Sequence, residues 1–161
     1  MNNLVTLYGR GVAFVASRGP ESVALLLLRA ALAGVFWRSG QTKVIEGSVL
    51  RIDPSQYDLF ASEFSGLPLD PAIAVPLTTY AEHIFPALLF FGLATRVSAS
   101  ALLVMTLVIQ IFVFPDAWWP AHSLWVAMAA ILTVRGGGIF SLDALLGKLR
   151  TGRPAVPASS L

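Results

Sequence analysis

Four apolar stretches divide this chain and constrain its fold more than any other feature of the sequence. They cover residues 23–40, 72–94, 97–114 and 121–135. Each approaches the roughly 20 residues that a helix needs to cross about 30 Å of hydrocarbon. Hydrophobic residues make up 56% of the chain and charged residues only 12%, a composition far from that of a soluble domain. We therefore predict an all-α polytopic membrane protein, a four-transmembrane-helix bundle with short interfacial helices.

Charged residues are distributed unevenly over the segments between the expected spans. Basic residues border one side of the membrane: Arg10, Arg18, Arg96, Arg135, Lys148, Arg150 and Arg153. Acidic residues prevail on the other side, in the long outer connection 41–71. By the positive-inside rule, both termini are expected in the cytoplasm of a bacterium, with the spans in its inner (plasma) membrane. A net charge of only +2 gives no indication of a nucleic-acid partner.

The expected organisation is a membrane domain with short flanking segments. In order, we predict a cytoplasmic amphipathic lead-in at 1–22, the four-helix domain at 23–146 and a disordered cytoplasmic tail at 147–161. Within the outer connection, apolar and acidic residues alternate over 57–64, which indicates either an interfacial helix or a lid. After the last span, Ser141 is expected to cap a short amphipathic helix that runs through Leu149.

Glu82 places a carboxylate near the middle of an apolar stretch, where an ionisable group costs about 2.5 to 3.5 kcal/mol on insertion. Helical rise brings Arg29 of the first span within about 10 Å of Glu82 in depth, so we predict an ion pair between them. Arg38 lies about 180° around the helix from Arg29 and is expected to reach out to the headgroups. The inward stripe of the first span is then Arg29, Ala33, Phe36, Gly40 and Lys43. The pair either only fixes helix register or acts as a relay or polar ligand site.

Other polar residues occur in the expected spans and complete a candidate intramembrane polar site. Besides Arg29 and Glu82, its members are Lys43, Thr78, Thr79, His83 and Gln110. Pro86 removes the amide that would bond the carbonyl of Glu82, and Gln110 is expected to form an interhelical hydrogen bond. The different depths expected for His83 and His122 do not favour a shared haem or metal, and no metal site is predicted. The chain has no cysteine, so its own residues provide no thiol or iron-sulfur chemistry.

Three sequence blocks, in this order, resemble the DoxX family of small four-span membrane proteins. They are LLLLRAALAGVFWRSGQTKV, AEHIFPALLFFGLATRVSA and GGGIFSLDALL, and the resemblance covers most of residues 22–146. The resemblance implies a family signature that includes, besides Arg29, Lys43 and Glu82, the residues Gly34, Gly40, Gly92, Arg96, Ser141, Leu142 and Asp143. The chain departs from the family in its long outer connection and in GGG at 136–138, where Gly-Pro-Gly is common.

The resemblance also implies an association with membrane quinol oxidase or redox-stress complexes. We therefore expect a non-catalytic accessory subunit of a membrane-associated redox or stress-response complex, in contact with the lipid bilayer and a protein partner. The chain itself is expected to hold no cofactor apart from a quinone at the bundle, and the oligomeric state stays open. The alternative is a small proton-, ion- or solute-transporting protein that uses Arg29 and Glu82. No nucleophile or metal cluster accompanies Glu82, which argues against an enzyme.

Overall fold

The structure, a computed structural model, describes residues 2–151 and is built of helices in that range. Four helical segments are long and apolar enough to cross a membrane: α2 (Arg18–Gln41), α4 (Pro71–Phe91), α5 (Thr95–Phe112) and the segment Pro115–Arg135. The last of these joins a 3-10 turn, η1 (Pro115–Ala117), a π-helical turn, η2 (Trp118–His122), and α6 (Ser123–Arg135). The prediction of an all-helical, four-span protein is confirmed.

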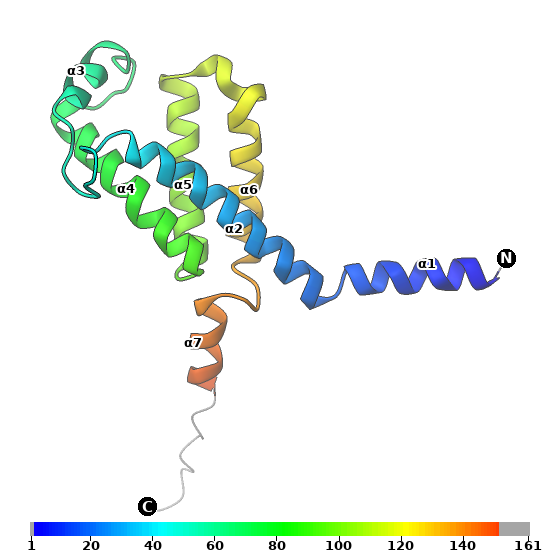
Figure 1. Cartoon of the computed structure of the whole chain (residues 1–161). Coiled ribbons are helices and arrows are strands. Elements are labelled where there is room, and N and C mark those ends of the chain that lie inside the picture. The colour runs from blue at the N-terminus through cyan, green and yellow to red at the C-terminus, as the bar shows by residue number, and fades with distance from the viewer. Residues whose placement is uncertain (1, 152–161) are drawn as a thin grey trace, which may run out of the picture.

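The four segments form two packed pairs that share a core. Helix α2 packs along α4, α5 packs along α6, and α2 also contacts α6. In Figure 1, α2 crosses the bundle obliquely and does not stand parallel to its neighbours. Apolar side chains from all four helices meet at the crossing, among them Leu32, Phe36, Leu89, Leu102 and Leu132. Because lipid is as apolar as these side chains, close packing and internal polar contacts must specify the arrangement.

One face of α2 turns inward, as predicted. Arg29, Ala33, Phe36, Gly40 and Lys43 are all buried, whereas Arg38 is exposed. These buried positions recur every three or four residues and therefore form one stripe along the helix. Among residues 5–150, the stripe carries the two buried cations, Arg29 and Lys43.

The segments at one end of the bundle, called here the inner end because α1 and α7 lie there, differ in extent from the predictions. Helix α1 (Asn2–Val15) extends away from the bundle (Figure 1), and α2 begins at Arg18, so residues 18–22 belong to the first span and not to the lead-in. Ser141 caps α7 (Leu142–Thr151), since its Oγ accepts a hydrogen bond from the amide of Ala144 at 3.2 Å. Because α7 continues to Thr151, the predicted disorder from residue 147 is wrong for residues 147–151. The rest of the predicted tail lies outside the described residues.

The outer connection between α2 and α4 is ordered around a short helix, α3 (Ser55–Ser62). An isolated antiparallel bridge between Val44 and Ile52 closes the loop that precedes it. Phe60 of α3 is buried against Ala74 and Val75 at the start of α4. The helix therefore rests on the outer end of α4 (Figure 1), close to where the Tyr57–Phe64 pattern predicted a helix.

Helices α2 and α4 approach one another closely at Gly40. A Cβ atom built on Gly40 would lie 2.8 Å from His83 Cε1 and 3.2 Å from Glu82 Cβ. A side chain at this position would push α2 away from α4. Gly34, one and a half turns earlier, has no neighbour within 4 Å of such an atom, so the two glycines of the same helix are under different constraints.

We expect Gly40→Ala to destabilise the protein, although alanine favours a helix by about 1 kcal/mol over glycine. Forcing a methyl group into this contact should cost about 1 to 3 kcal/mol. The matched change Gly34→Ala should leave stability unchanged or raise it slightly. Thermal unfolding of both variants in the same detergent measures the difference, and equal behaviour of the two would contradict the close contact.

Candidate functional site

Glu82 forms an ion pair with Lys43 inside the outer half of the bundle. Lys43 Nζ donates to Glu82 Oε2 at 2.6 Å, and the two side chains are 9% and 2% exposed. Ser39 completes the network, because its hydroxyl donates to Glu82 Oε1 at 3.2 Å and accepts from Lys43 Nζ at 3.1 Å. Lys43 Nζ also reaches the carbonyl of Ser39 at 3.4 Å. A buried carboxylate is thus compensated in both charge and hydrogen bonding, as burial requires.

The predicted ion pair between Arg29 and Glu82 is wrong. The crossing at Gly40 sets the end of α2 against Glu82, and Arg29 lies eleven residues earlier, about 16 Å along the helix. The prediction compared depths along upright helices, whereas α2 crosses the bundle obliquely. Lys43 instead follows the last turn of α2, where the chain turns back and brings its ammonium to Glu82.

Arg29 is fully buried at the other end of the bundle, where it holds two carbonyl groups. Its guanidinium donates to the carbonyl of Phe90 at 3.3 Å and to that of Phe140 at 2.6 Å. The first is among the last carbonyls of α4, which lack helical partners and attract positive charge. Arg29 therefore joins α2 to the end of α4 and to the segment before α7.

Gly92 makes room for this arrangement. It ends α4 in the left-handed region with φ +70°, and a Cβ atom there would collide with Arg29 Nη1. Such a conformation and such a close approach both favour glycine. Gly92, Ser141 and Asp143 meet at this corner, since Asp143 donates its amide to the carbonyl of Gly92 at 2.9 Å.

Asp143 caps the first turn of α5. Its carboxylate accepts hydrogen bonds of 2.8 Å from the amides of Ala94 and Thr95. Partial burial raises the pKa of Asp143, but these hydrogen bonds and the positive charge of Arg29 more than offset it, so the pKa lies below its ordinary value. The ionised carboxylate thus stabilises the turn between α4 and α5.

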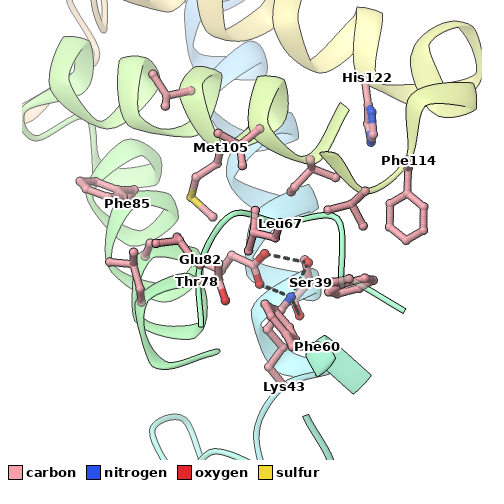
Figure 2. Close-up of a pocket in the computed structure, with 18 of the residues that line it drawn as sticks. Ser39, Lys43, Phe60, Leu67, Thr78, Glu82, Phe85, Met105, Phe114 and His122 are labelled. Carbon is pink, nitrogen blue, oxygen red and sulfur yellow. Dashed lines mark hydrogen bonds and ion pairs between the residues drawn. The ribbon is translucent and has the colours of Figure 1, made fainter. Parts of the chain in front are cut away.

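A cavity of about 410 Å³ lies beside the Glu82 network, between the outer halves of α4 and α5. Figure 2 shows Glu82, Lys43 and Ser39 together at one side of it and His122 at another. Apart from Ser39, Lys43, Thr78, Glu82 and His122, its wall consists of apolar and aromatic side chains: Phe60, Phe64, Leu67, Leu69, Leu77, Ala81, Phe85, Val104, Met105, Val108, Ile109, Val113, Phe114 and Trp125. Such a cavity suits a lipid-soluble molecule with a polar group.

The outer connection covers one side of the cavity. Phe60 and Phe64, from α3 and the residues just after it, line the cavity together with Leu67. Residues 57–64 thus lie largely in a helix and also cover the cavity, a position compatible with both interpretations, an interfacial helix and a lid. On the side of the bilayer, the lining residues Leu77 and Val104 are 56% and 59% exposed. The cavity thus borders both the lid and the surface that faces lipid.

The remaining predicted polar residues divide between the cavity wall and the interior. Thr78 lines the cavity, and its hydroxyl donates to the carbonyl of Ala74 at 2.8 Å. The hydroxyl of Thr79 donates to the carbonyl of Val75 at 2.7 Å. His83 Nδ1 donates to the carbonyl of Thr79 at 2.7 Å. The threonines and His83 therefore mainly donate hydrogen bonds to carbonyl groups of their own helix, α4.

Gln110 forms the interhelical contact that was predicted, but away from Glu82. Its amide joins α5 to η1 and η2 through the carbonyl of Pro115 and the ring of His122. Sequence reasoning missed Ser39, Gln41, His122 and Trp125 as members or neighbours of the site. For Ser39 a signal existed, because it precedes Gly40 by one residue and Lys43 by four on α2.

Among residues 5–150, no group of three or more His, Asp or Glu side chains is placed to hold a metal ion. His83 Nε2 accepts from the amide of Gln41 at 2.9 Å, and Trp37 packs edge-on against the same ring. Both ring nitrogens of His83 are therefore engaged by the protein.

Comparison with known proteins agrees with this four-span architecture. The DoxX family profile matches residues 24–115, more than half of the chain. The chain belongs to the DoxX family. An uncharacterised protein of Haemophilus influenzae is 31% identical over 144 aligned residues, which cover 80% of this chain and 87% of the relative. No solved structure matches the chain.

The other predicted signature residues of this DoxX-family protein have different structural roles. Arg96 donates to the carbonyl of Thr133 near the end of α6 at 3.3 Å and lies beside Gly136. Gly34 lies in a groove between α2 and α4 on the outside of the bundle. The predicted signature therefore combines the inner corner around Arg29, the Glu82 network and the packing surface of α2.

Removing one charge of the buried pair should destabilise the protein more than removing both. We expect Lys43→Met to destabilise the protein by about 3 to 5 kcal/mol, because Glu82 is then buried without a countercharge. The double variant Lys43→Met with Glu82→Leu should recover most of the loss. The free energy of unfolding in detergent is compared among the unchanged protein, the single variant and the double variant. Arg38→Met is the control, since this side chain is exposed.

Asp143 should make stability depend on pH at the acidic end. Its folded-state pKa lies below the unfolded value of about 3.9, so its stabilisation is complete above that value and is lost as the pH falls below it. Asp143→Ala should lower stability at pH 7 by about 1 kcal/mol and should flatten the decline between about pH 5 and 3. Thermal unfolding against pH tests this, with the exposed Asp116→Ala as a control that keeps the original profile.

Proposed function

We propose that this protein is a non-catalytic accessory subunit of a membrane-associated redox or stress-response complex and holds a quinone-class molecule between α4 and α5. The observation that carries the proposal is the apolar cavity with a buried ion pair in its wall. Ligand sites of this kind combine an apolar lining with a few polar groups that orient the ligand. A substituted quinone ring has the matching character, because it is apolar over its faces and polar at its oxygens.

The position of the cavity supports a ligand that arrives from the bilayer. Leu77 and Val104 lie on the wall and also on the exposed surface between α4 and α5. An isoprenoid tail would remain among the lipids beside these residues, while the ring lies near Ser39, Lys43 and Glu82. Phe60 and Phe64 would then separate the ring from the aqueous side.

The chain's own side chains favour a supporting role over catalysis. A bound quinone supplies two-electron, two-proton redox chemistry, but the sequence has no cysteine to exchange electrons with it. What the described residues offer is binding, orientation and exclusion of water. A partner protein would therefore provide the second redox centre.

We place the protein in the bacterial inner membrane with both termini in the cytoplasm. Arg18, Arg96 and Arg135 lie at the end of the bundle that carries α1 and α7. The outer connection at the opposite end holds Asp53, Asp58 and other acidic residues. This asymmetry is the one that the positive-inside rule describes.

The transport alternative fits the site less well. Glu82 and Lys43 neutralise one another through a direct 2.6 Å contact, and Arg29 is separate from both. A path for ions or polar solutes also needs a polar lining, whereas most of the cavity wall is apolar.

Purification from native membranes in a mild detergent tests the proposal. We expect a protein partner to co-purify, together with quinone or quinol in about equal amount to the protein, as quantified by mass spectrometry. Ala81→Trp should displace most of the ligand because Ala81 lines the cavity. Ala87→Trp, on the same helix but in the separate groove between α2 and α4, should leave the ligand in place.

A single-chain preparation without partner, quinone or quinol would overturn the proposal. Equal loss of ligand from both tryptophan variants would place it elsewhere on the protein.

A further inference from the structure

His122 is held on the cavity wall in a defined orientation. It is 3% exposed and lines the cavity, and Figure 2 shows it away from the Glu82 network. Its ring packs against Trp125 with centroids 4.9 Å apart, and Trp125 in turn packs against Phe36. On the other side, His122 Nδ1 lies 2.7 Å from Gln110 Oε1.

The amide of Gln110 determines which nitrogen of His122 carries the proton. Gln110 Nε2 donates to the carbonyl of Pro115 at 2.6 Å, and the reversed amide would set two acceptors against each other. Gln110 Oε1 therefore faces His122, and because this oxygen only accepts, His122 Nδ1 must donate. A neutral imidazole with its hydrogen on Nδ1 presents Nε2 as an acceptor.

His122 Nε2 is available to a ligand. Within residues 5–150, no hydrogen bond engages it and no carboxylate lies within ion-pair distance of the ring. Burial against Trp125 and other apolar groups favours the neutral ring, since an enclosed charge needs a countercharge. His122 thus has a lone pair that no described residue uses, on a ring that lines the cavity.

The hydroxyl and ammonium donors of the opposite wall already have acceptors. The three hydrogens of Lys43 Nζ have Glu82 Oε2 and the two oxygens of Ser39 within 3.4 Å. The hydroxyl of Ser39 donates to Glu82, which keeps further lone pairs on its carboxylate. Thr78 donates to its own helix. These groups therefore leave free acceptors at both sides of the cavity, and the indole N–H of Trp125, another lining residue, is a donor.

We infer that the occupant presents a phenolic hydroxyl to His122 Nε2, so that the cavity selects the reduced quinol over the corresponding quinone. This inference rests on the proposed function, because it concerns the same cavity and the same class of molecule. A quinol carries hydroxyl donors on opposite sides of an apolar ring, whereas a quinone carries only carbonyl acceptors. Setting a carbonyl against Nε2 would bring two acceptors together and leave both without a partner.

Binding of three matched probes to the purified protein in lipid nanodiscs tests this selection. The probes are decylubiquinol, decylubiquinone and the dimethyl ether of decylubiquinol, which keeps the ring but has no hydroxyl on it. Empty nanodiscs correct for partition into lipid, and oxygen is excluded. We expect the quinol to bind about tenfold more tightly than the other two, the effect of one well-made hydrogen bond in a dry site.

Two variants show whether His122 causes the preference. His122→Phe keeps an aromatic ring but removes the acceptor, so quinol affinity should fall to that of the quinone while quinone affinity changes less than twofold. Gln110→Leu keeps the imidazole but releases its tautomer, so that Nε2 can also donate, and the preference should shrink mainly because the quinone binds better.

The outcomes separate this inference from the proposed function. Equal binding of all three probes, abolished by Ala81→Trp, would overturn the inference and leave the quinone-class site standing. A tenfold preference that persists in both His122→Phe and Gln110→Leu would also overturn it. No saturable binding of any probe would overturn both.

Discussion

A cation enclosed by lipid and protein must find its partners inside the fold, and α2 and the turn that follows it carry two such cations, Arg29 and Lys43. Arg29 meets carbonyl groups at the inner end of the bundle, and Lys43 meets Glu82 in its outer half. The two contacts pair the middle of α2 with the end of α4, and the residues just after α2 with the middle of α4, which is the antiparallel register of these helices. Gly40 and Gly92 provide the space for it. Moving α2 along α4 by one turn would break both polar contacts, so the charges specify the register that apolar packing in lipid leaves open.

The sequence was sufficient to predict the number of spans, the inward face of α2, the outward Arg38 and the cap at Ser141, because each depends on local composition or helical periodicity. The partner of Glu82 was predicted wrongly because it depends on tilt and on the crossing point of two helices. Gly40 marks that crossing, but a glycine in a membrane helix has several uses, and Gly34 on the same helix contacts nothing comparable. Asp143 was assigned only through the resemblance, since its acceptors and donors come from residues about 50 positions earlier.

The cavity was beyond sequence reasoning for the same reason. Its wall combines residues from α2, α3, α4, α5 and the π-helical turn, segments that periodicity describes one at a time. His122 was expected at the outer interface, where a histidine is unremarkable. Gln110 determines which ring nitrogen of His122 carries the proton, and the orientation of Gln110 depends in turn on the carbonyl of Pro115. The site therefore depends on how the helices end and turn at the end of the bundle opposite α1 and α7, as much as on the buried carboxylate of Glu82.

The capped turn between α4 and α5 gives the bundle an unequal stiffness. At this end Arg29, Gly92 and Asp143 tie α2, α4, α5 and α7 together, whereas the opposite ends of α4 and α5 stand apart on either side of the cavity (Figure 1). When two helices are joined at one end, a small rotation at the turn between them produces a larger displacement at their opposite ends. Helices adapt to the thickness of the hydrocarbon layer by tilting, so we expect the acyl-chain length of the surrounding lipids to influence the separation of these two ends, which the outer connection bridges through the contact of Phe64 with Phe114.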